Sequence, residues 1–263
     1  MWKGIDVSYA QGYINWNVMK DYVDFAILRC GRGKYGTGEN TPKTDDRFLA
    51  NQKGCEANNI PYGVYFFSYA TSYEWALKEA KYCLSLIRGH KLGYPVYFDF
   101  EYDSADHYKK VNCINVTPEF VCKATEIFCE ELHKGGYYSA VYTNPDYIAR
   151  YYGEQFFHKY DLWLADWRAN GNKINARMWQ TGAGKVGTIS RVDTDNCYFD
   201  YPAYMEKGHI NGYPAKNLLP LHEIALEVIE GKWGAGEIRK KKLEEAGYNY
   251  REVQGEVNKI LWQ

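Results

Sequence analysis

The chain of 263 residues lacks three features that mark large classes of protein. Its formal net charge of -1 gives no excess of positive charge to attract nucleic acid or an acidic membrane surface. No apolar stretch is long enough to span a lipid bilayer. Its 7 cysteines and 6 histidines are dispersed, without a CxxC pair or the spacing of metal ligands. We therefore expect no nucleic-acid partner, no insertion into a membrane and no metal or other cofactor.

A recognisable signal peptide is also missing from the sequence. Met1-Trp2-Lys3 leads directly into the apolar residues 4–7, which have the character of a first core strand. The odd number and scattered positions of the cysteines favour reduced thiols over a disulfide framework. These observations predict synthesis in the cytoplasm, so a target outside the membrane would be reached only after release.

Aromatic residues are abundant instead, at 17% of the chain, with 26 Tyr and 8 Trp. A tyrosine combines an apolar ring with a hydroxyl group, which suits it to stacking on sugar rings and to hydrogen bonding at their edges. The same residues also fill protein cores, and hydrophobic residues at 46% are ample for one. The composition is therefore compatible with a carbohydrate-acting protein without requiring one.

Short apolar segments recur along the first 200 residues, with helical patterns between most of the early ones. They lie at residues 4–7, 25–30, 62–68, 96–101, 139–143, 162–166 and 176–180, and more weakly near Val192. Helix-start signals occur at Thr71…Glu74, Thr117-Pro118 and Asn144-Pro145, and residues 45–58 also have a helical pattern. Strands that alternate with helices predict a mostly parallel sheet, and about eight of them predict a barrel.

The connections between the later segments are short. About nine residues separate Asp166 from Ala176, and about eleven separate Gln180 from Val192. A parallel crossover that includes a helix needs roughly 10 to 12 residues at minimum. The sequence therefore predicts an α/β fold, a distorted (β/α) barrel of about eight strands whose outer helices are missing in the second half.

The pattern changes after Tyr201-Pro202. Residues 203–217 contain Gly208, Gly212 and Pro214 with little periodicity, which is typical of a linker. Helical patterns follow at residues 221–230, 237–246 and 249–260. We expect a barrel over residues 1–202, a linker over 203–217 and a small all-α module of three helices over 218–263.

One motif in the fourth apolar segment contains two acids, in the triplet Asp99-Phe100-Glu101. Side chains alternate along a strand, so Asp99 and Glu101 face one side while Phe100 faces the other. Carboxylates in an apolar strand are costly unless they are solvated, paired or used in chemistry. Glycosidic bond cleavage uses such a pair, with one acid protonated and the other ionised. A rim pair, a helix cap or a cation site is the alternative interpretation.

Motifs in this part of the chain occur together in a recognisable order. They are Gly4-Ile5-Asp6-Val7-Ser8, Tyr62-Gly63-Val64-Tyr65-Phe66-Phe67-Ser68-Tyr69, Phe98-Asp99-Phe100-Glu101, Leu162-Trp163-Leu164-Ala165, Trp179-Gln180 and Val192-Asp193. In this order they resemble glycoside hydrolase family 25, the muramidases of phages and bacteria. The resemblance covers about residues 1–200. It implies hydrolysis of the β-1,4 bond between N-acetylmuramic acid and N-acetylglucosamine in bacterial peptidoglycan.

The resemblance also implies roles for individual residues. Glu101 matches the general acid of the family, and Asp99, Asp6 and Asp193 match its other acids, although Asp195 could take the role of Asp193. Asp99 would either form a covalent bond or orient the acetamido group of the substrate as the nucleophile. The side chains expected to contact sugar, each of which could instead belong to the core, are Tyr65, Phe67, Tyr142, Trp163 and Gln180.

The last part of the chain resembles a second family. Its motifs are Ile224-Ala225, Val228-Ile229-Glu230-Gly231-Lys232-Trp233-Gly234 and Ala246-Gly247-Tyr248. They are similar to the short cell-wall-binding repeat of certain pneumococcal phage lysozymes, here in one copy where several are usual. Trp233 could stack on wall sugar or fill the core of the module.

Together these resemblances predict a lysozyme that acts on the cell wall, as a phage endolysin. A bacterial autolysin or secreted lysozyme of the same activity, and a non-catalytic wall-binding protein on this fold, remain as alternatives. Two further alternatives are a hydrolase for another N-acetylglucosamine polymer and a metal-dependent enzyme with Asp99 and Glu101 as ligands. The sequence leaves the oligomeric state open.

Overall fold

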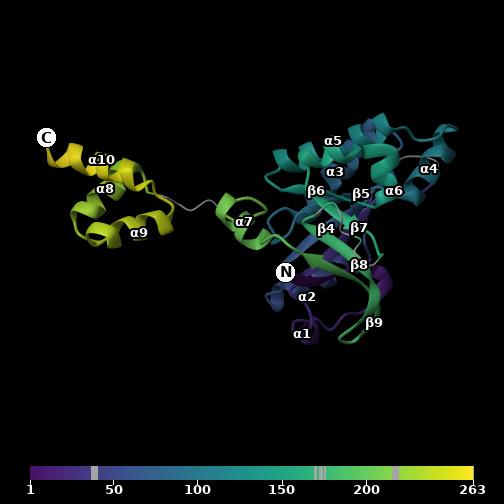
Figure 1. The fold of residues 1–263 in the computed structure, drawn as a ribbon, viewed down its shortest axis with the longest axis horizontal. Helices are drawn as coiled ribbons and strands as arrows, with labels where there is room; N and C mark the ends of the chain where they lie inside the picture. The colour runs from purple at the N-terminus through teal and green to yellow at the C-terminus, as the bar shows by residue number, and fades with distance from the viewer. Residues whose placement is uncertain (37–40, 169–170, 172–173, 175, 215–218, 263) are drawn as a thin grey trace. The chain divides into compact units, whose positions relative to one another are not determined.

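The computed structural model describes residues 1–36, 41–168, 171, 174, 176–214 and 219–262. The chain divides into two compact units, Met1–Tyr213 and Pro214–Gln263, which are described separately (Figure 1). Within the described residues, no helix combines the length and the apolar character needed to cross a membrane.

The first unit is a closed barrel, as the sequence predicts. Its eight strands within the described residues are β1 (Trp2–Val7), β2 (Phe25–Arg32), β4 (Tyr62–Phe67), β5 (Val96–Asp99), β6 (Ser139–Thr143), β7 (Leu162–Ala165), β8 (Met178–Val186) and β9 (Ile189–Cys197). The order around the barrel is β1-β2-β4-β5-β6-β7-β8-β9, and β9 pairs with β1 to close it. The two-residue strand β3 (Lys43–Thr44) pairs with the end of β2.

The last strand of the barrel departs from the parallel arrangement. Apart from the short β3, which is antiparallel to β2, the strands from β1 to β8 pair in parallel. β9 is antiparallel to both β8 and β1. β8 and β9 form a hairpin in which Val186 pairs with Ile189, and Gly187 in its turn has a φ of 51°. Such a tight hairpin fixes an antiparallel pair because a parallel pair requires a long crossover.

The outer helices are long in the first half and short in the second. The connections up to β6 include η1 (Tyr9–Gln11), α1 (Trp16–Met19), α2 (Phe48–Ala57), α3 (Tyr73–Ile87), α4 (Tyr102–Asn112) and α5 (Pro118–Lys134). Between β6 and β7 lie only α6 (Pro145–Tyr147) and the short turns Ile148–Tyr152 and Glu154–His158. The long helices α3 and α5 pack side by side over the barrel (Figure 1). The sequence predicts that outer helices are missing in the second half, and the described residues between β6 and β9 indeed contain only these short helical segments.

Most of the helices begin at the residues that the helix-start signals predict. The side chains of Thr117 and Asn144 accept hydrogen bonds from the backbone of the helices that they precede. The start of α3 differs by one residue, because Ser72 rather than Thr71 takes the extended conformation and accepts from the Trp75 backbone NH. Thr71 is buried instead.

Alternation along β5 divides its side chains between two cores. Phe98 and Phe100 belong to the core beneath the outer helices, where Phe98 packs against Phe128 of α5 with ring centroids 5.0 Å apart. Tyr97 lies inside the barrel, with its ring centroid 4.9 Å from that of Trp163. Asp99 and Glu101 therefore point toward the barrel interior at the carboxyl end of the strand.

The expected linker begins too early, because α7 (Tyr201–Gly208) occupies its first part. Tyr201 and Met205 are fully buried in the barrel unit. Asn211 follows the helix, and its side chain accepts from the Tyr138 backbone NH and donates to the carbonyls of Leu92 and Tyr94. Residues 203–213 thus belong with the barrel, and residues 215–218 lie outside the described part of the chain.

The second unit has the three helices that the sequence predicts, α8 (Leu221–Ile229), α9 (Gly236–Ala246) and α10 (Tyr250–Leu261). Their shared core is Ile224, Ala225, Val228, Leu243, Val253 and Val257. Trp233 packs against this core, with its ring edge-on to Tyr248, and its indole NH donates to Glu227 at 3.0 Å. These contacts favour the core role of Trp233.

Candidate active site

The carboxyl ends of the barrel strands bring the predicted acids together. Asp6 lies near the end of β1, directly opposite Asp193 of β9 in the strand pairing. Asp99 is the last residue of β5, and Glu101 follows two residues later as the N-cap of α4. Residues at this end of a parallel barrel are those that reach the open face.

One pocket of about 120 Å³ is lined by the four acids matched to the family and by the five side chains expected to contact sugar. The lining side chains are Asp6, Arg29, Tyr65, Phe67, Asp99, Glu101, Tyr142, Trp163, Gln180 and Asp193. The structure therefore brings these nine positions together in one pocket, with Arg29 beside them.

Asp99 and Glu101 form a coupled pair of acids in this pocket. Asp99 is 2% exposed, and burial followed by repulsion from Glu101 raises the pKa of Asp99 well above its usual value. Burial also raises the pKa of Glu101, and the carboxylates of Asp103 and Asp193 add to the rise while a hydrogen bond from Asp99 opposes it. The pair therefore retains a proton to higher pH than two isolated carboxyl groups would.

Asp6 and Asp195 form a second pair, deeper than the first. Burial and the charge of Asp193 raise the pKa of Asp6 to about 7, although Gln180 donates from Nε2 to Asp6 Oδ2 at 2.8 Å. Asp195 is 2% exposed, interacts with Asp6 and accepts from the Trp163 indole NH at 2.8 Å. Of the two candidates for the last acid, Asp193 lines the pocket, and Asp195 supports Asp6 from behind.

Arg29 lines the pocket, and the sequence analysis did not nominate it. Its guanidinium binds Asp45 Oδ2 through Nε at 2.7 Å and Nη2 at 2.6 Å, and stacks over the Tyr9 ring. Its positive charge lowers the pKa of Asp99, so it opposes full protonation of the acid pair. Arg29 is a charged residue within the apolar segment 25–30, just as Asp99 is within its own strand. A charge in an apolar strand could therefore have pointed to both residues.

The aromatic side chains form the floor and one wall of the pocket. Trp163 is 1% exposed, and the rings of Tyr65 and Tyr142 meet it edge-on, so it is a packed floor more than a free surface. The Tyr142 hydroxyl and the Trp167 indole NH both donate to Gln180 Oε1, at 3.2 and 3.1 Å. Trp167 is 53% exposed directly after β7, and the sequence analysis did not nominate it.

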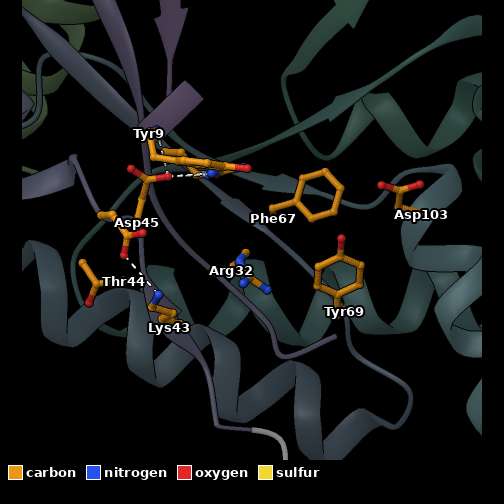
Figure 2. A pocket seen from close by; sticks show the side chains of 10 residues that line it. Tyr9, Arg32, Lys43, Thr44, Asp45, Phe67, Tyr69 and Asp103 are labelled. Atoms are coloured by element: carbon orange, nitrogen blue, oxygen red, sulfur yellow. Dashed lines mark hydrogen bonds and ion pairs between the residues drawn. The ribbon is translucent and has the colours of Figure 1, made fainter. Parts of the chain in front are cut away.

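Two larger depressions share lining residues with the small pocket. One of about 510 Å³ shares Arg29 and Phe67 with it and appears in Figure 2. The other, of about 440 Å³, shares Asp193. The acid pocket therefore has one depression beside Arg29 and Phe67 and another beside Asp193.

Among the described side chains, no group of three or more His, Cys, Asp or Glu residues is placed to hold an ion together.

Two family models match the chain in its two units. Residues 5–186 match the glycosyl hydrolases family 25, and residues 222–261 match the CW_7 repeat. No curated protein is significantly similar to the chain.

Solved structures share the barrel at low sequence identity. The modular autolysin LytC of Streptococcus pneumoniae is 24% identical with a TM-score of 0.62, over 75% of this chain and 46% of that one. A bacterial lysozyme of Streptomyces coelicolor is 22% identical with a TM-score of 0.61, over 81% and 98%. The catalytic domain of endolysin ply40, from bacteriophage P40 of Listeria monocytogenes, is 19% identical with a TM-score of 0.61, over 78% and 97%.

The chain thus spans less than half the length of LytC but nearly the whole of the two shorter structures. The neighbours share the fold, and the family model covers more than half of the chain, including the strands that contribute Asp6, Asp99 and Gln180. On this match the chain belongs to the glycosyl hydrolases family 25.

Proposed function

We propose that this glycosyl hydrolase is a muramidase, a lysozyme that cleaves the β-1,4 bond between N-acetylmuramic acid and N-acetylglucosamine in bacterial peptidoglycan. The observation that carries the proposal is that Asp99 and Glu101 line one pocket and that the pKa of each is raised there. One proton on such a pair supplies an acid and an anion at the same time.

In the proposed reaction Glu101 donates its proton to the glycosidic oxygen as the bond breaks. The same carboxylate then removes a proton from the attacking water. Glu101 is suited to this role because its side chain is more exposed than that of Asp99. The charge of Asp193 also raises the pKa of Glu101, which helps to keep it protonated.

Asp99 would stabilise the positive charge that develops on the sugar. Its Oδ1 is buried and accepts no hydrogen bond from the described residues, so its acceptor capacity is unused within them. That oxygen could bond to the sugar or accept from the NH of the acetamido group, and both routes fit a retaining scheme. Asp6 and Asp193 would add negative potential, and Gln180 would hold Asp6 in place.

For the chain as a whole, we propose a peptidoglycan hydrolase with a catalytic barrel and a separate wall-binding repeat. The match to the CW_7 repeat supports the second part. Among the structural neighbours, LytC was solved with a synthetic peptidoglycan ligand, and ply40 is a phage endolysin. We propose the endolysin role, with synthesis in the host cytoplasm and action on the wall after release.

Digestion of defined peptidoglycan, with the fragments identified by mass, tests this function. Fragments with reducing N-acetylmuramic acid ends are expected, whereas reducing N-acetylglucosamine ends would contradict the assigned bond. Glu101→Gln should lower the rate by about 10²–10⁴-fold, the usual contribution of general acid catalysis. Glu119→Gln, at an exposed acid of α5, is the matched control. Near-normal activity of Glu101→Gln in a folded protein would refute the role of Glu101.

A further inference from the structure

The depression of about 510 Å³ beside the acid pair is lined mostly by residues that do not line the acid pocket (Figure 2). Its volume lies within the range of small-molecule sites. Arg29 and Phe67 separate it from the acid pocket, and the ends of β2 and β4 and the first turn of α4 contribute Arg32, Tyr69 and Asp103. It therefore lies next to the proposed site of cleavage but contains none of the four acids assigned to it.

Most of the charges in this depression are neutralised within the protein. Arg29 pairs with Asp45 at 2.6 Å, and Lys43 pairs with Asp46 at 3.1 Å. Arg32 differs, because within the described residues its guanidinium makes one weak bond, to the Gly33 carbonyl at 3.4 Å, and has no carboxylate partner.

Asp103 is the anionic counterpart of Arg32. Among the described residues, no donor or cation pairs with its carboxylate, and the side chain is exposed in the first turn of α4. The depression thus offers one unpaired cation and one unpaired anion.

An aromatic pair separates these two charges. The rings of Phe67 and Tyr69 have centroids 5.1 Å apart, and in Figure 2 they lie between the Arg32 guanidinium and the Asp103 carboxylate. Both charges act on Tyr69. Its pKa is raised overall, because burial and the charge of Asp103 raise it by more than the charge of Arg32 lowers it. The opposite charges therefore face the same space without neutralising each other.

We propose that this depression binds the stem peptide of peptidoglycan, with Arg32 receiving a peptide carboxylate and Asp103 facing a peptide ammonium group. This inference rests on the proposed muramidase function. The N-acetylated sugars carry no ammonium group, and the muramic carboxyl is consumed in the amide bond to the peptide. The peptide supplies free carboxylates and, where it is not cross-linked, the amino group of its diamino acid.

The geometry of arginine suits this ligand. A guanidinium binds a carboxylate through two parallel hydrogen bonds, and such charge-assisted bonds are about twice as strong as neutral ones. A peptide attached to the muramic acid at the acid pair would have the neighbouring depression within reach. The competing occupant is the glycan itself, stacked on Phe67 and Tyr69.

The first experiment compares kcat/KM on two substrates, uncross-linked glycan that retains its peptides and the same glycan after an amidase has removed them. Arg32→Gln should reduce kcat/KM on the peptide-bearing glycan by about tenfold more than on the stripped glycan, since a hydrogen bond to a charged group is worth at least that much. Arg88→Gln is the matched control, an exposed arginine at the end of α3.

An equal loss on both substrates would place the glycan in the depression and overturn the proposal, as would no loss on either. If the unmodified enzyme releases reducing muramic acid from neither substrate, the muramidase function itself fails, which is a distinct result.

The second experiment tests the anionic side of the depression. Asp103→Asn should lower kcat/KM several-fold on peptides with a free amino group, and the deficit should vanish when that group is acetylated. Asp106→Asn, at an exposed acid one turn further along α4, is the control. The same deficit on free and acetylated peptides would remove the ammonium contact from the proposal.

Discussion

At the scale of one residue, the buried carboxyl group of Asp6 lowers the free energy of unfolding at neutral pH. Its pKa is about 7 in the folded chain against a usual 3.8. Between these two values the folded state binds more protons than the unfolded state, so the free energy of unfolding falls as pH rises through that window. A difference of about three pKa units corresponds to roughly 4 kcal/mol, an upper value because Asp6 is coupled to its neighbours.

Asp6→Asn should therefore stabilise the barrel at pH 7 by about 1–4 kcal/mol and have little effect near pH 4. The neutral side chain keeps an oxygen that can accept from Gln180. Denaturant unfolding at the two pH values, followed by near-UV circular dichroism, measures the difference. Asp21→Asn, at an exposed carboxyl, should show no such pH dependence. A stabilisation that is equal at both pH values would argue against titration of Asp6 as the cause.

Arg29 gives a second prediction at the residue scale. The side chain of Asp45 is 1% exposed, so Arg29→Gln leaves a buried carboxylate without its cation. We expect a loss of about 2–4 kcal/mol in unfolding free energy, close to the usual cost of breaking a buried pair. Asp45→Asn in the same chain should recover part of the loss in a double-mutant cycle.

The contrasting pair for that experiment is Lys43 with Asp46, whose side chains are 62% and 65% exposed. Lys43→Gln should cost less than about 1 kcal/mol, as is usual for surface ion pairs. A loss with Arg29→Gln no greater than that with Lys43→Gln would show that the Asp45 charge is solvated.

The alternation of side chains along a strand allowed part of the site to be predicted from the sequence. It assigned Phe98 and Phe100 to one side of β5 and Asp99 and Glu101 to the other, as the two cores show. The same rule could not choose between Asp193 and Asp195, because both point inward from β9. Only the pairing of β9 with β1, which sets Asp193 opposite Asp6, decides which of them reaches the pocket.

At the scale of elements, the barrel strands and the module helices could be read from apolar periodicity, whereas the end of the barrel unit could not. Residues 203–213 have the glycines and weak periodicity of a linker, yet they are held by long-range bonds. Asn211 contacts backbone groups more than 70 positions away in the chain, at Tyr138 and Tyr94. Such tertiary contacts leave no local signature in a single sequence.

Asn211→Gly tests whether those bonds fix the segment after α7. Asn211 has a φ of 55°, which glycine adopts easily, so the substitution removes the side chain without forcing the backbone. The buried groups of Tyr138, Leu92 and Tyr94 then lose their partner, and a loss of about 2–3 kcal/mol is expected. Asn17→Gly, at an exposed position, is the control. Hydrogen exchange at the Tyr138 NH should accelerate only in Asn211→Gly.

At the scale of the whole molecule, the proposed function assigns cleavage to the first unit and wall attachment to the second. The acid pocket is built entirely from residues of the first unit, and the core of the second unit is complete within its own three helices. Linking two binding modules can raise overall binding by 10²–10⁴-fold through effective concentration alone. One repeat attached to one barrel is the smallest arrangement that could show this gain.

A chain truncated to residues 1–213 should therefore cleave soluble peptidoglycan fragments at the rate of the full chain. On insoluble walls its lysis at low enzyme concentration should fall by about tenfold or more, a low value within the range for linked modules. Turbidity loss of purified walls and kcat/KM on soluble fragments are the two measurements. Restored lysis at high enzyme concentration would show that attachment was lost and catalysis was kept. Equal loss on walls and on soluble fragments would mean that the second unit supports the barrel itself.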